Sequence, residues 1–216
     1  MDNRTQSEAR TMAGSVTGLR RTAVLVAAGT VLLSAASCRK SPAGPSELPI
    51  TSSFLQGDEG WTVTGDGTMF YSPTGGNPSS TGYIFAIDRT EGDNFYFNSP
   101  GKFRGNMSNA YGRRLTFDLV WSENSPSDYK EAADIILRGG NVTITTQLPH
   151  LPGTTWTSYS VPLDTSGGWL VEATGQPATA SQMQAVLSSV QQFRIRGEFR
   201  QGAEQGGLDN VRFGVE

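Results

Sequence analysis

The chain has 216 residues, of which 17 are basic, 20 are acidic and only one is a cysteine. A net charge of −3 argues against a nucleic-acid partner, because binding to phosphates needs a basic face. One cysteine and one histidine exclude an intrachain disulfide and a zinc site built from sulfur and imidazole ligands.

The first 37 residues have the features of an export signal. An uncharged run, 22–37, follows the pair Arg20-Arg21 and ends at Cys38. A basic flank, a short apolar segment and small residues at its end are typical of a secretory signal. The cysteine directly after Ala35-Ala36-Ser37 resembles a bacterial lipobox, in which the cysteine sulfur takes a lipid and becomes the new first residue. We therefore expect 1–37 to be a lipoprotein signal peptide and Cys38 to be lipidated.

Three alternatives to this signal remain open. The 16 residues of 22–37 would rise about 24 Å as a helix, whereas the hydrocarbon core is about 30 Å thick, which disfavours an uncleaved membrane span. An ordinary cleaved signal and export in a folded state after the twin arginines are the others. A lipidated cysteine would anchor the protein outside the cytoplasm, at an outer membrane or cell surface if a second membrane exists.

Residues 38–49 are predicted to be a tether, and 50–216 the folded domain. The tether lacks periodicity and contains prolines at 42, 45 and 49, which is typical of a semi-stiff spacer. Residues 1–37 hold four of the 17 basic and two of the 20 acidic residues, so the remainder carries a net charge near −5. That charge gives no attraction to anionic lipid headgroups.

From Ile50 onward the pattern has a period of two, which predicts half-buried antiparallel strands. The alternation is clearest in 115–121, 157–163 and 193–199. Further strands are predicted at 61–64, 68–72, 83–88, 94–98, 133–138, 142–148 and 208–213. Turn residues cluster at 65–67, 74–78, 91–93, 139–141 and 206–207.

One segment has a helical period. Met183, Val186, Leu187 and Val190 share one apolar face, and Thr179 with Gln182 ahead of them forms a capping-box pattern. About ten strands and one short capping helix predict an all-β fold of two antiparallel sheets packed face to face, with the helix over one end.

An ordered set of short motifs runs from residue 51 to residue 214. It includes Gly57-Asp58-Glu59-Gly60-Trp61, Leu115-Thr116-Phe117-Asp118-Leu119 and Leu208-Asp209-Asn210-Val211. The other segments are 53–54, 75–78, 99–100, 102–106, 110–112, 134–137, 139–140, 156–159, 183–187 and 195–199. In this order they resemble the laminin IV type A domain, also called the laminin B domain. The resemblance implies an antiparallel jelly-roll β-sandwich related to galactose-binding-like folds. Because no cysteine-rich repeats flank it here, a basement-membrane role is not implied.

Several polar and aromatic residues are expected to be structural. Trp61, Trp156 and Trp169 are predicted to bury large areas and to give the indole N–H a partner. In the strand predicted at 193–199, Arg196 and Glu198 fall on the polar face, and we expect a structural ionic network, with ligand contact as the alternative.

Jelly-roll modules of this kind often hold one ion between the start of the first strand and the last strand. On this resemblance, Asp58, Glu59 and Asp209 are candidate ligands of a structural calcium ion, since carboxylate oxygens suit calcium. In the alternative interpretation, Asp58 caps a turn and Asp209 bonds to the backbone.

Nothing in the sequence predicts catalysis. His150, in Leu-Pro-His-Leu-Pro, is expected in an exposed loop, and no Gly-x-Ser-x-Gly motif accompanies it. Asp118 with Glu123 or Asp134 could supply the two carboxylates of a glycosidase, but no carboxylate cluster in any strand supports this. We therefore expect no catalytic residues.

Binding is the function that the sequence favours. Aromatic side chains on the sandwich could stack on sugar rings; those available are Tyr71, Tyr83, Tyr129, Trp121 and Trp169. The prediction is a lipid-anchored, extracytoplasmic, non-catalytic binding module for carbohydrate or for a protein at the cell surface. A structural envelope or adhesion component with protein partners only, and a glycan-active enzyme, are the alternatives.

Overall fold

The computed structural model describes residues 44–90, 92, 94–122, 131–200 and 202–216. The predicted signal peptide and Cys38 lie outside these residues, so the lipoprotein assignment stays a prediction. Within the described part of the chain, no helix is both long and apolar enough to cross a membrane. The end of the predicted tether already contacts the domain: the Ser46 N–H donates to the Asn106 carbonyl at 2.7 Å, and Leu48 packs against the core.

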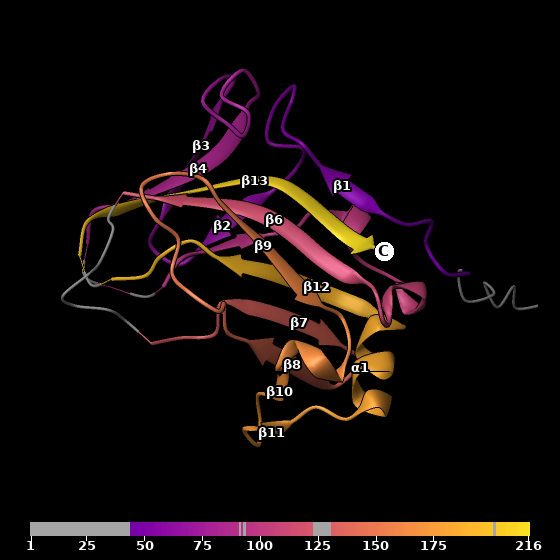
Figure 1. Ribbon diagram of the computed structural model, residues 1–216. Helices are drawn as coiled ribbons and strands as arrows, with labels where there is room; N and C mark the ends of the chain where they lie inside the picture. Colours follow the sequence, from indigo (N-terminus) through magenta and orange to yellow (C-terminus); the bar gives the residue numbers. More distant parts are fainter. Residues whose placement is uncertain (1–43, 91, 93, 123–130, 201) are drawn as a thin grey trace, which may run out of the picture. The chain divides into compact units, whose positions relative to one another are not determined.

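The described residues form two antiparallel sheets (Figure 1). Sheet A has the order β3 (Thr68–Ser72), β4 (Tyr83–Asp88), β13 (Glu204–Val215), β6 (Arg114–Trp121), β9 (Thr157–Pro162), and β1 (Ile50–Ser52) also pairs with β13. Sheet B has the order β11 (Gln176–Pro177), β10 (Leu170–Val171), β8 (Val142–Thr146), β7 (Ile135–Gly139), β12 (Val190–Arg196), β5 (Tyr96–Asn98), β2 (Thr62–Thr64). The antiparallel sandwich predicted from the period of two is confirmed.

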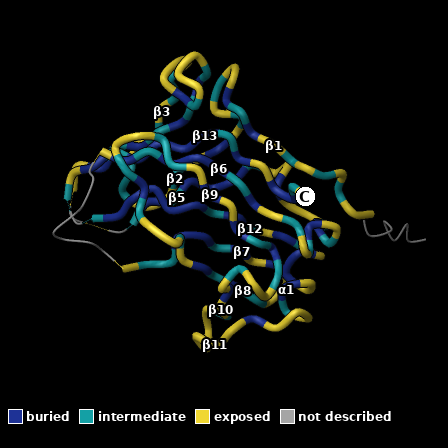
Figure 2. Tube along the Cα trace, viewed as in Figure 1, coloured by how far each residue is buried: buried dark blue, intermediate teal, exposed yellow. Residues whose placement is uncertain are grey.

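The core lies between the two sheets, and the alternation along the strands creates it. In β6, Leu115, Phe117, Leu119 and Trp121 are buried, whereas Thr116 and Val120 are half-buried; Asp118, on the same side as these two, is 7% exposed. Figure 2 shows buried stretches along the strands and exposed residues at the turns. Burial of each side chain of this size contributes roughly 1.5–3 kcal/mol to the free energy of folding, so the two apolar faces supply most of the stabilisation.

Aromatic rings join the sheets. Trp61 makes edge contacts with Phe54, Phe103 and Phe193 at centroid distances of 6.1, 5.5 and 6.0 Å. Its indole N–H donates to the Ser52 hydroxyl at 2.8 Å, as expected for a buried tryptophan. Trp61 therefore links the first strand to the centre of sheet B.

The helix α1 (Ala180–Leu187) covers part of sheet B, against β7 and β8. Thr179 and Gln182 form the capping box that the sequence predicts, and Met183, Val186 and Leu187 are buried. Short 3₁₀ turns lie at Gly101–Phe103, Ser108–Ala110 and Thr165–Gly167. The predicted strand at 94–98 begins only at Tyr96, and the β10–β11 hairpin was not predicted.

The sequence-based prediction was wrong at the glycines of β13. Gly206 and Gly207 were expected in a turn, but they lie inside the strand. A Cβ on Gly206 would lie 2.1 Å from the Gly197 carbonyl oxygen, and one on Gly207 would lie 2.7 Å from the Val120 side chain. Glycine is therefore needed here for close packing rather than for a turn.

Candidate binding face

The outer face of sheet A carries a row of aromatic rings. On β4, Ile84 and Ala86 point into the core, so Tyr83 and Phe85 point outward. Phe70 lies opposite Phe85 on β3, and the two rings stack at 5.4 Å with an angle of 23°. Tyr83 lies 5.5 Å from Phe85. Phe70 is 44% exposed, so the row reaches solvent.

Trp156, just before β9, continues the row. Its ring meets Tyr83 edge-on at 5.3 Å, and its indole N–H donates to the Gly75 carbonyl at 3.0 Å. It was predicted to be a core residue, but it is only half-buried. Trp156, Tyr83, Val120 and Gln205 line a hollow of about 490 Å³. A large ring fixed at the wall of a surface hollow can stack on a flat ligand.

A second, polar hollow lies on the same face. It also measures about 490 Å³ and is lined by Thr116, Asp118, Ser158, Ser160, Asn210 and Arg212, among others. The register places these residues side by side, since Asp118 pairs with Ser158 on β9 and Thr116 pairs with Arg212 on β13. Thr116 and Asp118 share the outward-facing side of β6 with Val120 of the first hollow. The face therefore combines aromatic rings with hydroxyl, carboxylate and guanidinium groups. We call these two hollows and the aromatic row the sheet A face.

Asp118 of the polar hollow belongs to a hydrogen-bond network that also includes the buried Asp209. The Asp118 carboxylate accepts hydrogen bonds from the side-chain amides of Asn77 at 3.0 Å and Asn210 at 2.8 Å. Asp209 accepts from the backbone N–H groups of Asn77 and Asn210 at 2.8 and 2.7 Å. Burial raises the pKa of Asp209 to about 6; those two backbone bonds lower it, and the charge of Asp118 raises it further. Protein donors therefore satisfy both oxygens of Asp209 and the Oδ2 of Asp118.

Comparison with known proteins agrees with this architecture. Residues 96–215, more than half of the chain, match the family Laminin B (Domain IV). The chain belongs to the laminin B family.

Solved structures show the same fold. The L4b domain of human laminin alpha-2 superimposes with a TM-score of 0.52 at 15% identity, covering 61% of this chain and 80% of that one. The family 11 carbohydrate-binding module of the Clostridium thermocellum cellulase Lic26A-Cel5E gives 0.51 at 11% identity, covering 79% and 96%. The C. thermocellum family 11 module in complex with a β-1,3-1,4-mixed-linked tetrasaccharide gives 0.50 at 11%, covering 79% and 98%. At these identities the likeness is one of fold.

In this laminin B domain the residues predicted to bind calcium have protein partners. The Asp58 carboxylate accepts from the Gly60 N–H at 2.9 Å within its own turn. Glu59 accepts from the N–H groups of Ser53 and Phe54 at 2.9 and 2.6 Å and pairs with Lys102. Among the described residues, Asp58, Glu59 and Asp209 do not gather into a group of three carboxylates. Calcium at these residues stays a prediction.

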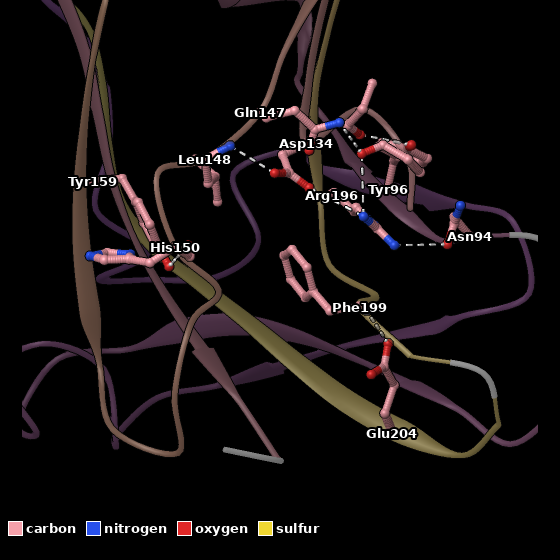
Figure 3. Close-up of polar contacts among 12 residues, drawn as sticks. Asn94, Tyr96, Asp134, Gln147, Leu148, His150, Tyr159, Arg196, Phe199 and Glu204 are labelled. Carbon is pink, nitrogen blue, oxygen red and sulfur yellow. Dashed lines mark hydrogen bonds and ion pairs between the residues drawn. The ribbon is translucent and has the colours of Figure 1, made fainter. Parts of the chain in front are cut away.

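The predicted ionic network around Arg196 is buried instead of lying on a polar strand face. Arg196 is 0% exposed, and its guanidinium pairs with Asp134 at 3.3 Å (Figure 3). It also donates to the side chain of Asn94 at 3.4 Å and lies 5.0 Å from the ring of Phe199. β12 ends at Arg196, so the chain beyond it no longer follows the alternation of a strand. Glu198, 1% exposed, accepts from the Phe95 N–H at 2.7 Å.

Burial also perturbs the acids near Arg196. It raises the pKa of Asp134, although the Leu148 N–H and Arg196 act to lower it. Burial likewise raises the pKa of Glu204 to about 8, against the lowering effect of hydrogen bonds from the Trp121 indole and the Phe199 N–H. We call Arg196, Asp134, Asn94, Phe199 and Glu204 the Arg196 cluster.

The other residues predicted as catalytic candidates or aromatic platforms lie in different environments. His150 lies in an exposed bend, as predicted, and Tyr159 donates to its carbonyl at 3.1 Å. Asp134 is held by Arg196 in the core, whereas Asp118 lies on the sheet A face; Glu123 and Tyr129 lie outside the described residues. Of the other proposed aromatic platforms, Trp121 and Trp169 are 2% exposed. Tyr71, half-buried, packs against the core, and Tyr83 joins the row.

Proposed function

We propose that this laminin B domain is a non-catalytic binding module that takes a carbohydrate on the sheet A face. The observation that carries the proposal is the aromatic row of Phe70, Phe85, Tyr83 and Trp156 beside a polar hollow on one open surface. Sugar rings offer an apolar C–H face and a rim of hydroxyls. Aromatic rings can stack on the C–H face, and Asp, Asn, Ser and Arg side chains can form hydrogen bonds with the hydroxyls.

The charge and geometry of the face favour a neutral saccharide. Asp118 is the one acidic and Arg212 the one basic side chain among the residues that line the polar hollow, so its formal charges balance. Val120 lines the first hollow and Thr116 and Asp118 line the second, so a saccharide chain that follows β6 would meet both hollows. The likeness in fold to a carbohydrate-binding module solved with a mixed-linked tetrasaccharide supports the same choice of ligand class.

The proposal is tested with a glycan array probed by the full chain in detergent. Trp156→Ala removes the ring at the wall of the first hollow, and Arg138→Ala, on the outer face of sheet B, is the matched control. We expect binding to at least one glycan by the native protein and by Arg138→Ala, and loss of that binding by Trp156→Ala. A blank array for the native protein would favour a protein partner instead.

We further propose that the module is held outside the cytoplasm by lipid on Cys38. The support is the order of basic pair, uncharged run and cysteine at 20–38. Intact mass of the protein extracted from membranes tests it. We expect a chain beginning at Cys38 with an added acyl mass; an unmodified cysteine in a freely soluble protein would contradict the anchor.

A further inference from the structure

Three carboxylates from distant parts of the chain meet at one end of the sandwich. Asp66 lies in the β2–β3 connection, Asp88 is the last residue of β4, and Glu198 follows β12. One oxygen from each lies within 4.8 Å of the other two. We propose that Asp66, Asp88 and Glu198 bind one calcium ion, at a site distinct from the one predicted from the sequence.

The hydrogen bonding leaves carboxylate oxygens without donors. Asp88 is 1% exposed, and its Oδ1 accepts from the Thr90 N–H at 2.9 Å. Its Oδ2 is buried and has no hydrogen-bond partner among the described residues, and the same holds for Asp66 Oδ1. A buried oxygen without a donor carries an uncompensated desolvation cost, so it requires an explanation.

The nearest hydroxyl cannot supply what is missing. The Thr90 Oγ1 lies 3.2 Å from Asp66 Oδ2 and also 3.2 Å from Asp88 Oδ1. A hydroxyl has one proton, so it donates to one carboxylate at a time. Two acidic side chains therefore face each other across a single shared proton donor.

A bound divalent cation would compensate the carboxylate oxygens that lack donors and would offset the repulsion between Asp66 and Asp88. Carboxylates this close repel one another, and burial strengthens the repulsion. Two oxygens that are each about 2.4 Å from a calcium ion are at most about 4.8 Å apart, which fits the observed grouping. The donor set is all oxygen, as hard cations prefer, and its irregular arrangement suits calcium better than the strict octahedron of magnesium.

The site has an opening to solvent. Asp66 and Thr90, with Arg89, line a surface hollow of about 380 Å³, so an ion with its remaining waters can enter the site from the side of Asp66. On the other side the backbone closes in, since a Cβ on Gly92 would lie 2.0 Å from Asp66 Oδ2.

An ion here would tie the two sheets together. Asp88 belongs to sheet A, whereas Glu198 follows β12, an inner strand of sheet B, and accepts from the Phe95 N–H. The expected role is structural, because the site lies at the end of β4, beyond Phe85 and Ile87 on that strand, rather than in either hollow of the sheet A face.

The test is calcium stoichiometry by equilibrium dialysis, together with melting of the full chain in detergent after chelation and readdition of calcium. We expect one ion per chain and a rise in Tm of about 5–10 °C at a calcium concentration near 100 times Kd. Asp88→Asn keeps the shape of the side chain and should lose the ion. Asp66→Asn, in a half-buried turn, should do the same if Asp88→Asn fails to fold.

Asp209→Asn is the matched control, because Asp209 belongs to the set predicted from the sequence. It should keep the ion. Loss of the ion in Asp209→Asn but not in Asp66→Asn would overturn the proposal, as would a native protein that binds no calcium and melts at the same temperature with and without chelator. Stabilisation by magnesium alone would overturn the choice of calcium.

Discussion

The Arg196 cluster and the sheet A face use similar residues in opposite ways. In the Arg196 cluster, the charged groups are buried and bonded to one another or to the backbone, with Arg196 fully covered by Asn94, Asp134 and Phe199. On the sheet A face, Asp118 and Arg212 line an open hollow beside exposed rings. Polar residues at the end of β12 hold the fold together, whereas Ser158, Ser160 and Arg212 of the polar hollow are exposed and remain available to a partner.

The comparison predicts different consequences for mutation. Changes in the Arg196 cluster should reduce stability, and any loss of binding should follow from that. Changes on the sheet A face should reduce binding while the protein remains folded. The following predictions run from the largest expected effect to the smallest.

Arg196→Met should destabilise the domain by about 3–5 kcal/mol, because it keeps the stem of the side chain but leaves Asp134 as an unpaired buried charge. Urea denaturation measures the loss. The double variant Arg196→Met with Asp134→Asn removes that charge and should recover much of the stability. A single-variant loss under about 1 kcal/mol would show that the ion pair is not structural.

Stability should depend on pH through Glu204. Its pKa is raised from 4.5 to about 8 by burial, so between these values the folded state holds a proton that the unfolded state has released. This contribution is fully present below pH 4.5 and is lost as pH rises toward 8, by about 1.4 kcal/mol per pH unit at most. Melting curves from pH 5 to pH 8 should show Tm falling, and Glu204→Gln should flatten the slope. An unchanged slope in Glu204→Gln would show that another titratable group causes the pH dependence of Tm.

Trp156→Ala should weaken saccharide binding about 30-fold, corresponding to about 2 kcal/mol for a central aromatic anchor. Because Trp156 is half-buried, its loss should leave the domain folded, as melting would show. Isothermal titration with a mixed-linked tetrasaccharide is the measurement, with Arg138→Ala as control. Equal weakening in Arg138→Ala would remove the distinction between the two sheets.

Phe70→Ala should have the smallest effect. Phe70 stands at the end of the aromatic row on the edge strand β3 and stacks on Phe85. Its removal should cost about 0.5–1.5 kcal/mol of contact energy, and it should weaken only ligands long enough to reach it. Titration with a disaccharide and a tetrasaccharide separates the cases: a loss confined to the longer ligand is expected, and an equal loss for both would place Phe70 at the centre of the site.

The sequence predicted the architecture because the alternation in β6 and β9 and the capping box at Thr179 are local signals. It failed where packing between segments decided the outcome. Gly206 and Gly207 are residues of close approach inside a strand, and only the neighbouring Gly197 and Val120 reveal this.

The candidate sites were less predictable for the same reason. The sequence predicted Tyr83 as a platform for a sugar ring but predicted that Trp156 is buried. Whether a tryptophan just before a strand is buried depends on which segments pack around it, and here it borders a surface hollow. Asp66, Asp88 and Glu198 carry no shared motif and meet only through the topology. The one signal that could have suggested them is the acidic residue Asp66 between two turn glycines.

The most direct test of the sheet A face is the set of tryptophan indole N–H signals in a nitrogen–proton NMR spectrum of the full chain during titration with the tetrasaccharide. Trp61 and Trp169 are 1% and 2% exposed and donate to groups inside the domain, whereas Trp156 borders the open hollow. The account predicts that the Trp156 signal moves and that those of Trp61 and Trp169 stay in place. A bound saccharide that leaves the Trp156 signal unmoved would contradict it.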